Sequence, residues 1–133
     1  MYTSEADVLL LQRSDNPEFW QSVTGALDKD EQPAEAAQRE LLEETGLTVP
    51  LTDHQQSRQY PIAEQWRARY PAWATVNTEH LFSACVESRV AVTLDPAEHL
   101  DSCWVTATEA IDRVFSATNR DAIRQIVLNR YGR

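Results

Sequence analysis

Apolar positions in the first third of the chain form two short runs, followed by a helical repeat. Residues 8–12 and 19–23 are rich in apolar side chains and bounded by polar ones, which predicts two buried strands. Residues 33–44 repeat their apolar positions with helical spacing. They begin with a proline and are followed by Gly46, as is typical of the start and end of a helix. We therefore expect strands first and a helix early in the chain.

Strand patterns return after this helix. The segments richest in β-branched and aromatic residues are 55–62, 77–86, 90–93 and 102–105, which predicts four more strands. No repeat, linker-like tract or break in composition divides the chain, so we expect a single domain over residues 1–133.

The end of the chain carries helical patterns. Thr106 or Thr108 can cap a helix that reaches Val114. Thr118 or Asn119 can cap a last helix, whose apolar residues share one face by i, i+3, i+4 spacing. Strands with one early helix and helices at the end indicate an α/β fold in which helices pack on a mixed sheet.

Composition and charge exclude several classes of protein. With 133 residues, of which 42% are hydrophobic and 25% charged, the chain is neither disordered nor collagen-like. Twelve basic side chains against 21 acidic ones give a net charge of -9, so we expect neither nucleic acid nor an anionic membrane as a partner. An anionic small molecule would need a cation to help it bind.

Location and redox state are also constrained by the sequence. The longest aliphatic run is far shorter than a membrane span, and the first residues lack the pattern of a secretory signal, so we expect a cytoplasmic protein. Cys85 and Cys103 have no metal-binding spacing, and we expect both to be reduced core residues.

Acidic side chains concentrate in the early helix. Glu40, Glu43 and Glu44 share one arc of its surface in the last turns, where the helix dipole disfavours negative charge. Glu40 and Glu44 also form a like-charge i,i+4 pair. A bound divalent cation such as Mg²⁺ would reverse both penalties. The alternative is a solvated acidic helix on which Arg39 pairs with Glu35 or Glu43.

A longer motif surrounds these glutamates. Residues 25–47 read G-x5-E-x7-R-E-L-L-E-E-T-G-L, which resembles the Nudix box at every specified position. The resemblance implies an αβα sandwich, a divalent-metal site that holds Mg²⁺ or Mn²⁺, and hydrolysis of a diphosphate linked to another group. It assigns metal binding to Glu40, Glu43 and Glu44, loop and helix-end geometry to Gly25 and Gly46, and the orientation of a glutamate to Arg39.

The flanking segments resemble a narrower group, the bacterial Nudix hydrolases that act on dihydroneopterin triphosphate. They include residues 10–13, 16–25, 69–70, 77–79, 98–100 and 116–120. This resemblance implies a Mg²⁺-dependent pyrophosphohydrolase of folate biosynthesis that works as a monomer or weak dimer on a small triphosphate. One alternative is a housecleaning enzyme that cleaves dATP or other dNTPs. A Nudix-like module that binds a nucleotide without cleaving it is disfavoured, because all box glutamates are present.

Two charged residues outside the box acquire roles from this resemblance. Arg13 would contact the triphosphate, as a planar guanidinium suits phosphate; otherwise it is a surface arginine at a strand end. Glu98 would join the metal cluster, and it is a candidate general base together with Glu43 and Glu44; otherwise it is a solvated loop acid. His99, beside Glu98, is expected to be a structural hydrogen bonder.

The resemblance also assigns contacts to the rest of the substrate, at Thr24, Tyr60, Pro61, Ile62, Ala63 and Ser116. An aromatic ring in the segment from Tyr60 could stack on a flat heterocycle. The residues alone leave other interpretations open: Thr24 as a turn residue, Ile62 as ordinary strand packing, and Ser116 as a helix cap.

One departure from the family pattern concerns its first strand. Family members normally begin with a strand upstream of residue 8, and this chain starts at Met1 and Tyr2, where that strand would be ending. We therefore expect the usual first strand to be missing. Either translation begins further upstream, or part of the sheet is unpaired, which would lower stability or activity.

Overall fold

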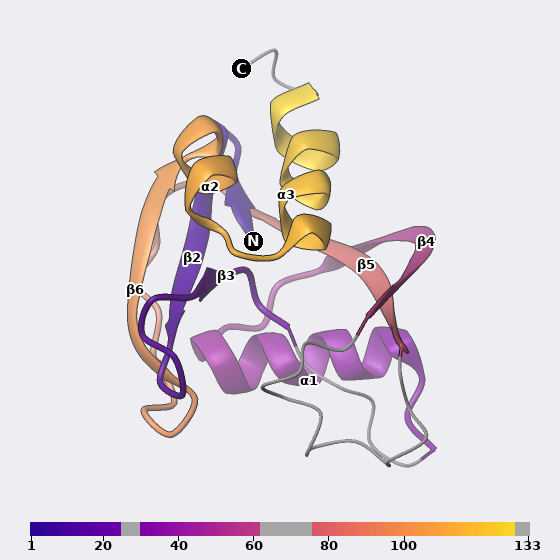
Figure 1. The fold of residues 1–133 in the computed structure, drawn as a ribbon. Helices are drawn as coiled ribbons and strands as arrows, with labels where there is room; N and C mark the ends of the chain where they lie inside the picture. The colour runs from indigo at the N-terminus through magenta and orange to yellow at the C-terminus, as the bar shows by residue number, and fades with distance from the viewer. Residues whose placement is uncertain (25–29, 62–75, 130–133) are drawn as a thin grey trace.

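The computed structural model describes residues 1–24, 30–61 and 76–129. The elements follow one another as β1 (Tyr2–Thr3), β2 (Asp7–Arg13), β3 (Trp20–Gln21), α1 (Pro33–Thr45), β4 (Leu51–Pro61), β5 (Val76–Val86), β6 (His99–Thr106), α2 (Ala107–Arg113), α3 (Ala117–Ile123) and a π-helical turn at Arg124–Leu128. Helix α1 lies on one side of the strands, and α2 and α3 lie on the other (Figure 1). None of the helices in these ranges is long and apolar enough to span a membrane.

The strands form a mixed sheet, as expected. Their order is β3-β2-β1-β5-β4. Strand β6 lies off this path and also pairs with β2. The β1–β5 pair is parallel, whereas β2 runs antiparallel to both β1 and β6. The two longest strands, β4 and β5, form an antiparallel pair with a register shift between Asp53 and Ser57. Apolar side chains on both faces of β2 are buried, because helices or strands cover each face.

Strand β1 occupies the place at which we expected a strand to be missing. It has two residues, and Tyr2 bridges Val8 on one side and Cys85 on the other. Thr3 is 1% exposed, and its hydroxyl accepts hydrogen bonds from the backbone N–H groups of Glu5 and Asp7. The missing-strand prediction was therefore wrong in its strict form: a short strand joins the two halves of the sheet.

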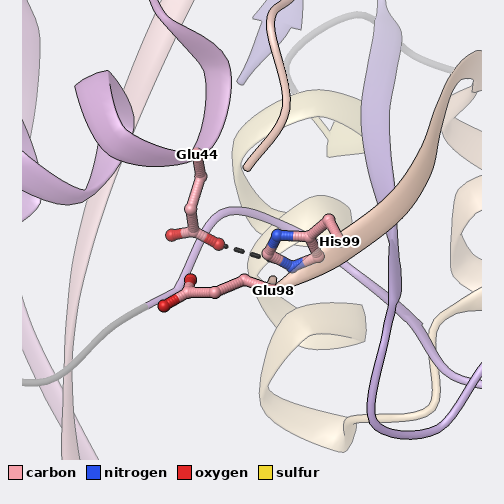
Figure 2. Close-up of side chains that lie close together, drawn as sticks. All are labelled: Glu44, Glu98 and His99. Atoms are coloured by element: carbon pink, nitrogen blue, oxygen red, sulfur yellow. Dashed lines mark ion pairs between the residues drawn. The ribbon is translucent and has the colours of Figure 1, made fainter. Parts of the chain in front are cut away.

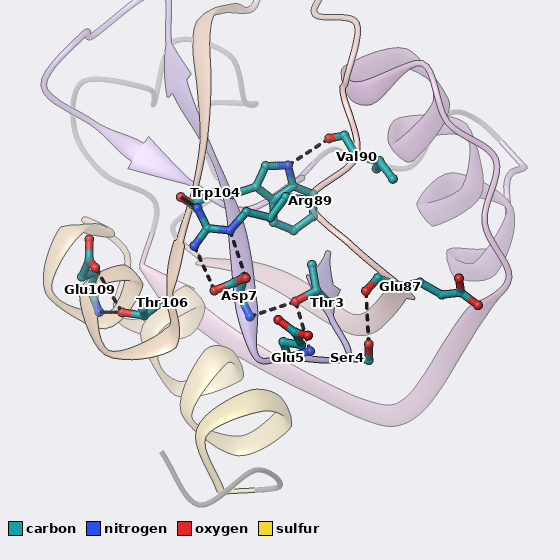
Figure 3. A network of polar contacts seen from close by, with 10 residues as sticks. All are labelled: Thr3, Ser4, Glu5, Asp7, Glu87, Arg89, Val90, Trp104, Thr106 and Glu109. Carbon is teal, nitrogen blue, oxygen red and sulfur yellow. Dashed lines mark hydrogen bonds and ion pairs between the residues drawn. The ribbon is translucent and has the colours of Figure 1, made fainter.

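A polar network joins the segment after β5 to β2 and β6 (Figure 3). Arg89 donates from Nε and Nη2 to the two carboxylate oxygens of Asp7, both at 3.0 Å, and from Nη1 to the carbonyl oxygen of Trp104 at 3.2 Å. The indole of Trp104 donates to the carbonyl oxygen of Val90 at 2.9 Å. The segment after β5 is thereby fastened to β2 and β6.

The hydrogen bond to Val90 is found where we predicted a strand at residues 90–93. Residues 90–93 contain no strand; instead the backbone N–H of Thr93 donates to the carbonyl oxygen of Thr45 at 2.7 Å. The strand predicted at 19–23 is shorter in the structure, where β3 has two residues.

Both cysteines are free, as expected, but Cys85 is exposed, which contradicts its expected place in the core.

The helix caps in the second half are Thr106 and Ser116, both of which the sequence analysis offered as caps. Thr106 caps α2, and its hydroxyl accepts a hydrogen bond from the backbone N–H of Glu109. Helix α3 begins after Ser116, whose hydroxyl accepts from the backbone N–H of Asn119 at 3.3 Å. The predicted caps Thr118 and Asn119 were therefore wrong, because the helix starts one residue before Thr118.

Candidate active site

The end of α1 has a fixed position. Gly46 follows the helix with φ of 75°, and its N–H donates to the carbonyl oxygen of Leu42 at 2.8 Å. A Cβ added at Gly46 would lie 3.0 Å from Cβ of Thr93, so a side chain here meets both backbone strain and a close neighbour. The prediction that Gly46 shapes the helix end is consistent with this geometry.

The three glutamates of α1 have different surroundings. The side chain of Glu43 is 49% exposed, that of Glu40 is 13% exposed, and that of Glu44 is 1% exposed. Only Glu44 is therefore fully turned toward the interior, although the three share one arc of the helix. The shared arc was correctly predicted, but it did not reveal which member is buried.

Arg39 collects the carboxylates on the outer part of this arc. Its guanidinium donates to both oxygens of Glu31, at 2.8 and 2.9 Å, to Oε1 of Glu40 at 2.8 Å and to Oε2 of Glu43 at 3.2 Å. Glu31 is the first glutamate of the motif, so Arg39 joins both ends of the motif. This arrangement agrees with the expectation that Arg39 orients a glutamate.

Glu44 meets two residues from the other side of the molecule. Figure 2 shows its carboxylate beside Glu98 and His99, where the chain enters β6. Oxygen or nitrogen atoms of all three lie within 4.8 Å of one another, and Oε1 of Glu44 is 3.5 Å from Nε2 of His99. The turn that carries Glu98 is anchored by Ser14, whose N–H donates to the carbonyl oxygen of Glu98 at 2.9 Å.

The carboxyl group of Glu44 lies where a negative charge is unfavourable. Burial, and then the negative charges of Glu40 and Glu98, raise the pKa of Glu44 to about 9. Burial also raises the pKa of Glu40. Oε2 of Glu44 is buried and has no hydrogen-bond partner among the described residues. Carboxylate oxygens that lack a counter-charge suit a hard divalent cation, so the donor set here fits one.

His99 and Gln21 also belong to the site: His99 was expected only to be a structural hydrogen bonder, and Gln21 was not predicted to take part. Arg13 donates from Nη1 to Oε1 of Gln21 at 3.0 Å, which turns the amide nitrogen of Gln21 toward Nε2 of His99, 3.1 Å away. An amide nitrogen is a donor, so Nε2 of His99 is the acceptor and its ring is neutral. Burial, followed by the positive charge of Arg13, lowers the pKa of His99, in agreement with a neutral ring.

Seven of the residues predicted to bind metal or substrate line one cleft of about 1230 Å³. They are Arg13, Thr24, Glu40, Glu44, Pro61, Glu98 and Ser116. Arg13 also forks onto the carboxylate of Asp15, at 2.7 and 2.6 Å. Tyr60 pairs through its backbone with Asn77, next to the cleft. Gly25, Ile62 and Ala63 lie outside the described residues, and Glu43 is not among the residues that line the cleft.

The comparisons with known proteins agree with this site. A family model for the NUDIX domain matches residues 1–126. The chain belongs to the Nudix family. Dihydroneopterin triphosphate diphosphatase of Haemophilus influenzae is 39% identical over 135 residues, which cover 97% of this chain and 84% of that protein. The protein of the same name from Escherichia coli K12 is 39% identical over 129 residues, covering 92% and 83%.

Solved structures give the same result. The structure of E. coli dihydroneopterin triphosphate pyrophosphohydrolase matches this Nudix chain with a TM-score of 0.92 and 36% identity, covering 96% of this chain and 90% of that one. A Nudix hydrolase structure from Listeria monocytogenes matches with a TM-score of 0.75 and 25% identity, covering 93% and 83%. The expected mixed α/β Nudix fold and the expected enzyme class, a Nudix hydrolase acting on phosphorus anhydrides, are confirmed.

Proposed function

We propose that this Nudix hydrolase converts 7,8-dihydroneopterin triphosphate and water to the monophosphate and pyrophosphate, with Mg²⁺ as its metal. One observation carries the proposal: a buried carboxylate, Glu44, with an oxygen unpartnered among the described residues, faces Glu98 in the large cleft. The substrate is inferred from the names of the relatives that are 39% identical over most of the chain.

Glu40, Glu44 and Glu98 are the residues that would hold the metal. They offer oxygen donors, as Mg²⁺ or Mn²⁺ requires, and the negative charges of Glu40 and Glu98 add to the effect of burial in raising the pKa of Glu44. The metal, when bound, would supply positive charge against phosphate oxygens and lower the pKa of water. Glu43 remains a predicted ligand by position, although here it pairs with Arg39.

The remaining side chains of the cleft divide between proton transfer and binding. Glu98 is exposed and lines the cleft, so it is the best-placed carboxylate to take a proton from the attacking water. Water attacks one of the two phosphorus atoms of the bridge between the α and β phosphates, and the bond from that phosphorus to the bridging oxygen breaks. The bridging oxygen leaves with the bond electrons, and the products are the monophosphate and pyrophosphate. Arg13 and Thr24 would hold the triphosphate, and the segment from Tyr60 to Ala63 would line the heterocycle.

The test is a substrate panel with purified protein and Mg²⁺, read by pyrophosphate formation. We expect kcat/KM for dihydroneopterin triphosphate to exceed that for dATP. A preference for dATP would instead assign the protein to nucleotide-pool housecleaning. If no candidate releases pyrophosphate, the chain is a binding module and the proposal is overturned.

A further inference from the structure

A further carboxylate, Glu79, lies in the same cleft and has no role in the chemistry above. Glu79, on β5, is half-buried and lines the cleft. Its backbone partner on β4 is Arg58, whose side chain reaches Asp121 at 3.2 Å and Gln125 at 3.1 Å, beyond the start of α3. Arg58 is therefore engaged with the helix, and no described residue places a cation on Glu79.

Glu79 is held instead by a chain of hydroxyl groups. Thr118 Oγ1 lies 2.7 Å from Oε2 of Glu79, and Ser116 Oγ lies 2.8 Å from Thr118 Oγ1. A carboxylate only accepts, so Thr118 gives its one proton to Glu79. Ser116 must then give its own proton to Thr118. Ser116 Oγ in turn accepts from the backbone N–H of Asn119 at 3.3 Å, which fixes the chain to the first turn of α3.

The hydrogen bonds from Ser116 to Thr118 and from Thr118 to Glu79 leave acceptor sites free on the Glu79 carboxylate, as far as the described residues are concerned. A carboxylate has about four acceptor sites, and the described residues use one of them on Glu79. The other carboxylate oxygen, Oε1, has no hydrogen bond to any described residue, since the one bond on Glu79 goes to Oε2. Glu79 is thus a positioned acceptor whose direction is set by Thr118.

The place of Glu79 relates it to the heterocycle rather than to the phosphates. The β4–β5 register pairs Arg58 with Glu79, Gln59 with Thr78, and Tyr60 with Asn77. Glu79 therefore lies two positions along the ladder from Tyr60, where the segment expected to line the heterocycle begins. The metal-binding carboxylates come from α1 and from the start of β6.

An acceptor-only group selects a ligand edge that carries two neighbouring donors. A 2-amino-4-oxopteridine presents a ring N–H beside an amino group, which matches the two oxygens of a carboxylate. Adenine presents an unprotonated ring nitrogen beside its amino group, and that nitrogen would face Glu79 as a second acceptor. Unpaired acceptors in a cleft are costly, so the discrimination can be large.

We propose that Glu79 reads the 2-amino-4-oxo edge of a pterin ring, and that Thr118 and Ser116 are positioning residues that aim its carboxylate. The inference rests on the proposed function, because it assumes that the cleft takes a pterin. It explains how one site favours dihydroneopterin triphosphate over dATP, although both carry the same triphosphate.

The test measures the ratio of kcat/KM for dihydroneopterin triphosphate to that for dATP. Glu79→Gln keeps the size of the side chain but replaces an acceptor by an amide N–H₂ donor. We expect the ratio to fall about ten- to a hundredfold, the range found for bidentate recognition of a heterocycle edge. Glu87→Gln, a change on an exposed carboxylate just after β5, is the matched control and should leave the ratio unchanged.

Two further variants keep the test valid if Glu79→Gln does not fold. Thr118→Val removes the hydroxyl and keeps the shape, and we expect it to lower the ratio several-fold. Thr118→Ser restores the hydroxyl and should restore most of the ratio. A purely structural link between β5 and α3 would lower both kcat/KM values by the same factor, and an unchanged ratio in every variant overturns the proposal.

Binding of neopterin, which has no phosphates, separates this inference from the proposed function. Its fluorescence anisotropy reports affinity without turnover, and we expect at least a tenfold loss in Glu79→Gln. A wild-type protein that binds neopterin through Glu79 but does not cleave the triphosphate would refute only the proposed function. Cleavage of the triphosphate with unchanged neopterin affinity in Glu79→Gln would refute only the inference.

Discussion

Two groups of charged side chains in this protein differ in whether their carboxylate oxygens have hydrogen-bond partners among the described residues. In the network of Figure 3, both oxygens of Asp7 receive hydrogen bonds from Arg89, and the remaining Arg89 nitrogen reaches a backbone carbonyl. In the cluster of Figure 2, Glu44 is more deeply buried than Asp7, yet one of its oxygens has no partner among the described residues. The first group is paired within itself, and we propose that the second is completed by a cation.

The difference concerns the stability of the fold, which only the second group lowers. Charges near solvent that pair with each other contribute little to stability. A buried carboxylate next to two others is unfavourable, and such conflicts between local rules and the fold are expected at functional sites. The two groups should therefore respond differently to mutation, metal and pH.

The largest difference should appear in catalysis. Glu44→Gln removes a predicted metal ligand, and we expect pyrophosphate release to fall at least about a hundredfold, because even outer-shell changes at metal sites cost 10- to 100-fold. Glu43→Gln is the matched comparison on the same helix. Since Glu43 is exposed and pairs with Arg39, we expect the fold decrease in pyrophosphate release in Glu43→Gln to be less than a tenth of that in Glu44→Gln. Equal losses in both variants would remove the distinction drawn here between buried and exposed glutamates.

Mg²⁺ should stabilise the protein through the cluster alone. At a hundred times its dissociation constant, a ligand of the folded state adds about 2.7 kcal/mol, which is several degrees in Tm for a chain of this size. We expect this rise in wild type and in Arg89→Gln, and little of it in Glu44→Gln. Scanning calorimetry with and without a chelator checks it. A similar rise in Glu44→Gln would place the metal elsewhere.

The pH dependence of the metal-free protein should separate the two groups further. The pKa of Glu44 is raised to about 9 in the folded state, above its ordinary value of 4.5, so the folded state holds this proton more tightly than the unfolded state. That contribution to stability is complete below pH 4.5 and is lost as the pH rises toward 9. We expect Tm to fall across this window in wild type and to fall less in Glu44→Gln. Parallel curves would contradict the raised pKa.

The smallest effect should follow from breaking the complete network. Arg89→Gln removes an ion pair between two residues that do not line the cleft, and we expect Tm to fall by no more than about 3 °C. Pyrophosphate release should stay within a factor of about two of wild type. A loss of activity comparable to that of Glu44→Gln would show that the network supports the cleft as well as the strands.

Much of the fold could be predicted because its signals are local. The helix expected at 33–44 is α1, Pro33–Thr45, since a proline start and a glycine stop both lie within the segment. The strand predicted at 8–12 is part of β2, because the apolar run that indicates it also lies within the segment. The segment 90–93 has a strand-like composition, but its backbone groups bond to the end of α1 and to Trp104. Composition does not reveal such distant partners.

The site was predicted in part for a similar reason. The motif identified Glu40, Glu43 and Glu44, but helical spacing alone does not decide which of them is buried. His99 could be recognised only from the pairing of β2 with β6, which places it opposite Arg13 after a register shift. That pairing joins residues more than eighty positions apart, so no local pattern reports it.

The close fit at Gly46 links ordinary packing to chemistry. The left-handed residue, its neighbour Thr93 and the hydrogen bond from Thr93 to Thr45 together determine how far α1 advances toward the sheet. Glu44 is the residue just before Thr45, so its carboxylate inherits that depth. A displacement of a few tenths of an ångström at this contact would move the carboxylate of Glu44 in the cleft without any change in the residues that perform the reaction.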